Sequence, residues 1–297
     1  MARVIRVHEF GGPEALVEET IPDSAPGAGE IRIRQTAVGV NFTDVHTRRG
    51  DHPDLHALPR PIGVGQEAVG RVEVVAAGVT RFRVGGRVAY ATRPLGAYAD
   101  VRNLSADRCV PVPDGIADEA VAATLLKGLT VRCLIQLVYP VRPGDTVVFH
   151  AAAGGVGTIA GQWLSAIGAR AVGIVGARDK VELARASGYA HVFVQGEDDW
   201  AGQVRELTAG AGVPVVYDSV GRSTWDESIA CLGRTGRMVC FGNTSGLVPP
   251  LSVNLLRDRG SLWLTWMKFG DYTATTAELD ACAAAFFAAL RSGTVTP

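Results

Sequence analysis

The stretch TVVFHAAAGGVG, residues 146–157, decides the fold of this chain. Its first half, ending at His150, is a short apolar run that predicts a buried strand. The second half predicts a tight loop opening a helix, where backbone N–H groups can approach a pyrophosphate that a Cβ atom would hold off. Such runs also occur in tight packing without a ligand, but the place between strand and helix favours a dinucleotide. The predicted phosphate loop comprises Ala152, Ala153, Gly154, Gly155, Val156 and Gly157.

Beyond this loop, apolar strands alternate with helical segments of about ten to fifteen residues. Strands are expected at 146–150, 171–176, 191–194, 213–220, 237–242 and 261–267. The intervening segments 179–188, 198–208 and 223–233 have helical patterns. This alternation predicts βαβ units and an α/β fold with a parallel, doubly wound sheet of the Rossmann type.

The first 110 residues have a different texture, because short apolar stretches such as 30–40, 68–78 and 85–91 are punctuated by Gly and Pro. They predict a β-rich domain ahead of the Rossmann domain. We place the boundaries at 1–122 for the β-rich domain and 123–270 for the Rossmann domain. Residues 271–297 are expected to begin a return to the first domain that is cut short.

The end of the second parallel strand indicates which dinucleotide is bound. Enzymes that use NAD place an acid there to bind the ribose hydroxyls. Here the strand ends at Gly176, followed by Arg178 and Lys180, whose charges attract a 2′-phosphate. Asp179 is expected to be a helix N-cap. The alternative is that Arg178 and Lys180 are simply solvated residues, but the pattern favours NADPH.

Composition narrows the class of protein. The 297 residues are 47% hydrophobic and 20% charged, with a formal net charge of −1, which argues against nucleic-acid and anionic-membrane partners. The five cysteines are scattered, and the N-terminus lacks an apolar signal core, so we expect a soluble cytoplasmic protein with buried thiols. The uncharged stretch 146–169 fits a buried strand and helix better than a membrane span.

Several motifs together resemble the quinone oxidoreductase (zeta-crystallin-like) branch of the medium-chain dehydrogenase/reductase superfamily. They span the whole chain and include the phosphate loop with its preceding Gly144-Asp145, the opening VIRVHEFGGPEAL, VNFTD at 40–44, KGLT at 127–130, DSVG at 218–221 and FGNTSG at 241–246. The resemblance implies a GroES-like catalytic domain before the Rossmann domain. It also implies an NADPH-dependent reductase acting on a small quinone or an α,β-unsaturated carbonyl.

The positions that bind zinc in other members of this superfamily are informative in this chain. Zinc alcohol dehydrogenases carry Cys and His where this chain has Asn41 and Gln66, which are poor zinc ligands, so no metal site is expected. An electron-poor quinone or enone can accept hydride without a Lewis acid, because the charge delocalises. The alternatives are an alcohol dehydrogenase, an enoyl reductase of a biosynthetic pathway, and a non-catalytic NADPH-binding protein.

The resemblance also implies roles for single residues. Asn41 and Asp44 would face the nicotinamide, and Thr130 would bind its carboxamide. Lys180 would hold the 2′-phosphate, with Gln195 standing where the family often has a Tyr. His46 and His52 occupy two cleft positions and are either proton donors or ordinary polar loop residues. The nicotinamide side would be lined by Phe241, Gly242, Asn243, Leu264 and Thr265.

The last expected strand, SLWLTWM at 261–267, is apolar on both faces and ends a sheet. An exposed apolar edge of this kind favours pairing with its own copy. We therefore expect a homodimer joined through the Rossmann domains, with a covering loop as the alternative.

Overall fold

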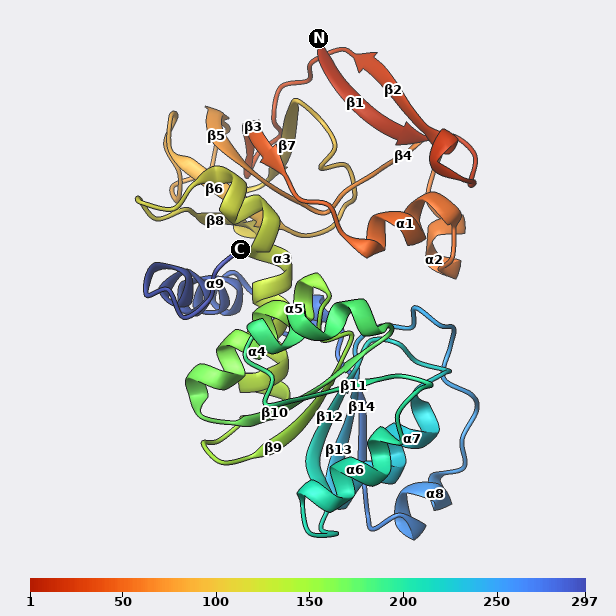
Figure 1. The fold of residues 1–297 in the computed structure, drawn as a ribbon. Coiled ribbons are helices and arrows are strands. Elements are labelled where there is room, and N and C mark those ends of the chain that lie inside the picture. The colour runs from red at the N-terminus through yellow and green to blue at the C-terminus, as the bar shows by residue number, and fades with distance from the viewer. The chain divides into compact units, whose positions relative to one another are not determined.

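The computed structural model describes the chain from Met1 to Pro297, apart from the side chain of Pro53. It divides into two compact units (Figure 1). Unit 1 comprises Met1–Leu126 with Thr273–Phe287 and Pro297, and unit 2 comprises Lys127–Tyr272 with Ala288–Thr296. The division falls inside one helix, α3, which runs over Asp118–Arg132 and continues as a π-helical turn, η3, over Cys133–Val138.

Unit 1 is built on two antiparallel sheets, of order β2-β1-β4 and β7-β3-β5-β6-β8. The larger sheet has one face in a core that includes Ile31, Ile33, Val72 and Tyr90, as its alternating apolar pattern requires. The strands are β1 Ala2–Val7, β2 Leu16–Ile21, β3 Glu30–Val38, β4 Ile62–Gly63, β5 Glu67–Val75, β6 Arg87–Ala91, β7 Val101–Ser105 and β8 Cys109–Pro111. The helical segments are η1 Pro13–Ala15, α1 Phe42–Arg49, α2 Pro53–His56, η2 Ala106–Arg108 and most of α9 Thr276–Arg291.

Unit 2 contains one six-stranded parallel sheet of order β11-β10-β9-β12-β13-β14. Its first strand in sequence, β9, lies in the middle, and the order reverses beside it, which confirms the predicted doubly wound Rossmann sheet. The strands are β9 Thr146–His150, β10 Arg170–Val175, β11 His191–Val194, β12 Val213–Asp218, β13 Leu232–Cys240 and β14 Trp263–Trp266. The helical segments are α4 Gly155–Ile167, η4 Arg178–Lys180, α5 Val181–Ala186, α6 Trp200–Leu207, α7 Trp225–Cys231, α8 Val253–Asp258 and η5 Phe269–Asp271.

The main difference from the predicted elements lies at β13. This strand was expected to begin at residue 237, yet it begins at Leu232, directly after α7. The added first part of the strand contains Gly233 and Gly236. Its pairing with β12 is irregular, because the register shifts between Val213 and Val215. Glycines inside a strand weaken the sequence signal for it, which explains the late expectation.

Two expectations about buried apolar segments can be checked in unit 2 and at its border. The uncharged stretch 146–169 forms β9 and α4 rather than one long helix. By length and composition alone one helical stretch, Asp118–Val138, could cross a membrane, but 61% of its most apolar window is buried inside the structure. All five cysteines are buried free thiols, as predicted.

Candidate functional site

The phosphate loop lies between β9 and α4, at the carboxyl edge of the parallel sheet. Ala151 turns the chain with a φ of 51°, and Gly154 is the extended N-cap of α4. A Cβ atom on Gly157 would lie 2.3 Å from the carbonyl oxygen of Ala151, so only glycine allows the helix to pack this closely on the loop. Tyr189 Oη donates to the Gly157 carbonyl at 2.8 Å and fixes the first turn of α4. The loop therefore has the form that presents helix N–H groups to a diphosphate.

A pocket of about 350 Å³ opens beside this loop, wholly within unit 2. Of the residues predicted to bind the cofactor, five line it: Ala153, Gly154, Gly176, Lys180 and Gln195. Ala152 is buried beneath the loop, where its N–H donates to the Ile174 carbonyl at 3.1 Å. The other lining residues are His150, Ala151, Ile174, Val175, Val220, Ser223, Thr224 and Thr244.

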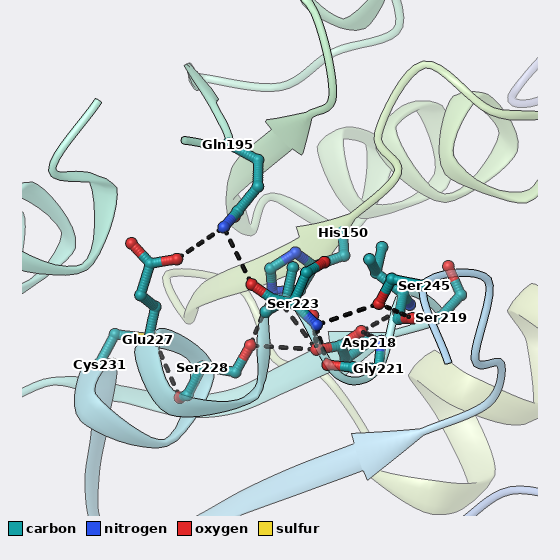
Figure 2. Close-up of polar contacts among 12 residues, drawn as sticks. His150, Gln195, Asp218, Ser219, Gly221, Ser223, Glu227, Ser228, Cys231 and Ser245 are labelled. Carbon is teal, nitrogen blue, oxygen red and sulfur yellow. Dashed lines mark hydrogen bonds and ion pairs between the residues drawn. The ribbon is translucent and has the colours of Figure 1, made fainter. Parts of the chain in front are cut away.

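Gln195 forms part of the pocket wall, but its amide is committed to the protein (Figure 2). Its Nε2 donates to Glu227 Oε2 at 2.7 Å and to the Ser223 carbonyl at 3.2 Å. Its Oε1 accepts from the Trp200 indole N–H at 2.8 Å. Both amide hydrogens and the amide oxygen therefore have partners within the wall, and Gln195 shapes the pocket rather than offering an open donor to a phosphate.

Arg178 does not line the pocket. Its guanidinium donates from Nε to Glu197 Oε2 at 3.0 Å and makes a second contact through Nη2. The hydrogen bond to Glu197, together with the opposite charges, raises the pKa of the arginine above its ordinary value. Lys180 is thus the cation at the pocket, whereas Arg178 is held by a carboxylate on the surface.

The expectation that Asp179 caps a helix was wrong. Asp179 lies in the middle of the 3₁₀ turn η4, whose N-cap is Ala177, and α5 follows only from Val181. The chain enters the helix through this turn, so Asp179 lies two positions after the N-cap of η4 and one position before the N-cap of α5, Lys180.

Asp218, the last residue of β12, is the centre of a buried network beside the pocket (Figure 2). Its Oδ1 accepts from the N–H groups of Val220 at 2.6 Å and Gly221 at 3.0 Å. Its Oδ2 accepts from Thr224 Oγ1 at 2.7 Å and Ser228 Oγ at 3.1 Å. These four donors stabilise the carboxylate and hold the turn that carries Ser223 and Thr224 to the pocket.

His150 adjoins this network and is 1% exposed. Its Nε2 lies 2.9 Å from Ser228 Oγ and 3.8 Å from Asp218 Oδ2. Its ring packs edge-on against Trp200, with the centroids 5.2 Å apart. Burial lowers the pKa of His150, and the charge of Asp218 opposes this only in part, so the imidazole is neutral.

The loop that follows β13 packs against the loop that follows β12. Phe241 donates its N–H to the Asp218 carbonyl at 2.9 Å, and Thr244 donates to the Ser219 carbonyl at 3.2 Å. Gly242 passes so close to Ser219 that a Cβ atom would lie 2.7 Å from that carbonyl oxygen. Of the predicted nicotinamide-side residues, Phe241, Gly242 and Asn243 lie together on this loop. Leu264 and Thr265 lie apart from the pocket lining, on β14 beside Met238 and Val239.

The predicted catalytic residues of unit 1 form a separate polar cluster at the start of α1. Asn41 is the N-cap, and its N–H donates to Asp44 Oδ2 at 2.9 Å. Asn41 Nδ2 donates to Glu67 Oε1 at 2.6 Å, while Tyr98 Oη donates to Asp44 Oδ2 at 2.9 Å. Burial and the Asp44 carboxylate both raise the pKa of Tyr98, which keeps its phenol protonated. Glu67 is fully buried and also accepts from the Leu126 N–H at 2.6 Å.

His46 and His52 are neighbours in unit 1, with ring centroids 4.9 Å apart. His46 Nδ1 lies 2.8 Å from Asp51 Oδ2, and its ring packs edge-on against Phe42. An aspartate at this distance orients the imidazole ring of His46. Thr130 lies in the unit 2 part of α3.

Among the described residues, no group of three or more His, Cys, Asp and Glu side chains could hold a metal ion. Asn41, at one of the two metal-ligand positions of the zinc enzymes, uses its amide hydrogen to bind Glu67. At this position the Asn41 amide and the Glu67 carboxylate therefore bind each other.

Sequence reasoning missed His150, Ser223, Thr224 and Thr244 as pocket residues. A signal for them existed, because Asp218-Ser219-Val220-Gly221 stands at the carboxyl end of the predicted strand 213–220, where ligands bind in open parallel sheets. His150 was the last residue of the strand that decided the fold, and its position at the same edge points to the same crevice.

Comparison with known proteins agrees with this architecture. Family models described as "Alcohol dehydrogenase GroES-like domain" and "Zinc-binding dehydrogenase" match residues 27–114 and 155–279. The chain is 43% identical to a quinone oxidoreductase of Pseudomonas aeruginosa, over 99% of this chain and 90% of that protein. It is 41% identical to a 2-haloacrylate reductase of a Burkholderia species, over 99% and 88%. The crystal structure of Escherichia coli quinone oxidoreductase complexed with NADPH is similar with a TM-score of 0.94, at 41% identity over 99% of this chain and 89% of that one.

These matches confirm the GroES-like and Rossmann domains and the predicted resemblance. The chain belongs to the quinone oxidoreductase branch of the medium-chain dehydrogenase/reductase superfamily.

Proposed function

We propose that this protein is an NADPH-dependent reductase that transfers hydride to a quinone or to an activated alkene. The observation that carries the proposal is the pocket of unit 2, which is lined both by the N-cap of α4 and by the cation of Lys180. The relatives support it, since one is a quinone oxidoreductase and another is a 2-haloacrylate reductase. A bound NADPH would supply the hydride, and the side chains of this chain would bind, orient and protonate.

The pocket fits the phosphates of NADPH. Backbone N–H groups of the first turn of α4 would bind the pyrophosphate, and Lys180 would bind the 2′-phosphate. Gly176 borders the pocket with no atom within 4 Å of the position a Cβ would take, so the backbone there is open to a ligand. No Asp or Glu is among the described residues that line the pocket, so no lining carboxylate faces a 2′-phosphate.

The polar cluster of unit 1 and Thr130 would serve the reacting end. Asn41 and Asp44 are held rigidly by Glu67 and Tyr98 and would position the nicotinamide and substrate. Thr130 would hydrogen-bond the carboxamide and select the ring face. We assign the proton donor to His46, because Asp51 orients its ring, with His52 beside it.

NADPH oxidation with a panel of quinones and a panel of enones tests the proposal. We expect turnover with at least one panel, transfer of deuterium from C4-deuterated NADPH to the β-carbon of an enone, and no loss of activity after exhaustive chelation. Replacing His46 by Phe should slow enone reduction more than quinone reduction, because an enone must be protonated at carbon to complete turnover. Tight NADPH binding without turnover in either panel would instead favour a non-catalytic NADPH-binding protein.

We also propose that two copies pair through β14. This strand ends the sheet, and Trp263 and Trp266 on it are 62% and 50% exposed. A second copy would satisfy the open strand edge and cover both indoles. Sedimentation at micromolar concentration should show a dimer, and Trp263→Lys should shift it to monomer. A monomeric wild-type protein would contradict the pairing.

The five buried thiols fit a reducing compartment, and we place the protein in the cytoplasm. Fractionation of the source cells tests this placement. Recovery of the protein in a membrane pellet would contradict it.

A further inference from the structure

His150 has one ring nitrogen whose role is open. Ser228 Oγ has a single hydrogen, and the Asp218 carboxylate 3.1 Å away can only accept it. The lone pairs of Ser228 Oγ then face His150 Nε2 at 2.9 Å, so the imidazole carries its proton on Nε2 and donates it to the serine. The neutral state of the ring agrees with this assignment, since a neutral imidazole has one donor and one acceptor.

Nδ1 is consequently the acceptor. Among the described groups of the chain none hydrogen-bonds this atom, although it is fully buried. Figure 2 shows it on the side of the ring away from Ser228. A ring flip would give up the bond to Ser228, and Trp200 packs against the ring edge, so the orientation is fixed. A buried acceptor without a donor destabilises the free protein and is satisfied only when a donor arrives.

His150 also lines the pocket beside the phosphate loop. We propose that His150 is a cofactor-positioning residue, whose Nδ1 accepts a hydrogen bond from the adenosine half of the bound dinucleotide. This inference rests on the proposed function, because it takes the pocket to be the dinucleotide site. Ser228 and Asp218 act through His150 by setting its tautomer and direction.

The chemistry of the ligand selects its adenosine half. The phosphates of a dinucleotide are acceptors at neutral pH and cannot satisfy Nδ1, whereas the 2′-phosphorylated adenosine offers its ribose 3′-hydroxyl and its exocyclic N–H₂ group as donors. Because the imidazole of His150 is neutral, it does not repel the ammonium group of Lys180. The same Asp218 that orients His150 also fixes the turn bearing Ser223 and Thr224, so one carboxylate sets two parts of the pocket wall.

Binding of adenosine 2′,5′-bisphosphate by calorimetry tests the inference without any turnover. His150→Phe keeps the ring volume and the contact with Trp200 but has no acceptor, so we expect affinity to fall about threefold to tenfold. His191→Phe is the matched control, because His191 is an exposed histidine of the neighbouring sheet region outside the pocket lining, and its affinity should equal that of the wild type. Because His150→Phe also removes the bond to Ser228, the melting temperature of the unliganded variant is measured to confirm that it is folded during the titration.

A second measurement on the wild-type protein avoids the question of folding. In ¹⁵N-histidine spectra, free His150 should show the pattern of the Nε2–H tautomer, and its Nδ1 resonance should move upfield when the bisphosphate binds. A hypoxanthine analogue of the bisphosphate separates the two donors: a retained shift assigns the ribose hydroxyl, and a lost shift assigns the amino group.

Three results have distinct meanings. Equal affinity of wild type and His150→Phe, or an Nδ1 resonance that does not move in the saturated wild-type protein, would overturn the inference and leave NADPH binding intact. No binding of the bisphosphate to the wild type would overturn both the inference and the proposed function. Weaker binding by His150→Phe together with the Nδ1 shift would support the inference.

Discussion

The two candidate sites of this chain are built in opposite ways. The pocket of unit 2 depends on backbone: a glycine that admits a helix, a helix N-terminus, and loops tied to Asp218. The cluster of unit 1 depends on side chains, in which Asn41 and Asp44 are held by Glu67 and Tyr98 from distant strands and loops. A backbone site tolerates change in most side chains but not in its glycines, whereas a side-chain site is sensitive at each polar partner.

The largest effect is expected at Gly157. In Gly157→Ala the new Cβ would lie 2.3 Å from the Ala151 carbonyl oxygen and push α4 from the loop. We expect a loss of about 1–3 kcal/mol in the free energy of unfolding from overpacking, and about a hundredfold loss of turnover from misplacement of the cofactor. Chemical denaturation and steady-state kinetics measure the two losses. Gly176→Ala is the control, because its Cβ meets open space, and it should fold with wild-type stability.

The matching test in unit 1 is Glu67→Gln. The buried carboxylate accepts from Asn41 Nδ2 and from the Leu126 N–H, and an amide would turn a donor toward one of them. We expect a loss of about 2–3 kcal/mol in unfolding free energy, as for charge-assisted hydrogen bonds. Binding of adenosine 2′,5′-bisphosphate should be unaffected below the melting transition. Equal stability of variant and wild type would show that the cluster is not held by its side-chain partners.

Lys180→Ala tests the cation that lines the backbone pocket. NADPH affinity should fall about tenfold to a hundredfold, while NADH affinity stays nearly constant, because only NADPH carries the 2′-phosphate. Fluorescence titration with both cofactors gives the ratio. Arg185→Ala removes a surface cation of the following helix, α5, that pairs with Glu182, and it should change neither affinity. Equal losses for NADPH and NADH in Lys180→Ala would remove Lys180 from the 2′-phosphate site.

Stability against pH distinguishes the buried histidine of unit 2. The pKa of His150 is lowered by burial, so the unfolded chain binds its proton below the ordinary value of 6.5 while the folded chain does not. The contribution of His150 is therefore fully present above that value and is lost as pH falls toward the lowered pKa, by up to about 1.4 kcal/mol per pH unit. Denaturation curves of wild type and His150→Phe should diverge in this acidic window. Parallel curves would contradict a neutral His150.

The smallest effect is expected at Glu197. In Glu197→Gln, Arg178 loses its carboxylate partner and becomes able to meet a 2′-phosphate. NADPH affinity should rise about twofold to fivefold, the range of an exposed ion pair, and NADH affinity should not change. The same titration in an Arg178→Ala background should show no gain. A gain there would mean that Glu197 acts directly on the ligand.

The features of the fold and site that could be predicted from the sequence are those that depend on neighbouring residues. The strands at 146–150 and 191–194, the phosphate loop and the parallel sheet were predictable, because strand periodicity and glycine placement are local signals. The pairing of Arg178 with Glu197 and the commitment of the Gln195 amide were not, since each joins residues far apart along the chain. The prediction that Asp179 caps a helix failed because a 3₁₀ turn precedes α5 and moves the start of the helix along the chain.

The hydrogen bonds that join Trp200, Gln195 and Glu227 limit how this pocket can change during evolution. Replacing Gln195 alone would leave the Trp200 indole N–H and the Glu227 carboxylate without this partner at once, so a tyrosine at this position is not one tolerated step away. Glu227 and Trp200 would have to change first or together with it. The three positions therefore form an epistatic unit, in which the history of each residue limits the substitutions open to the other two.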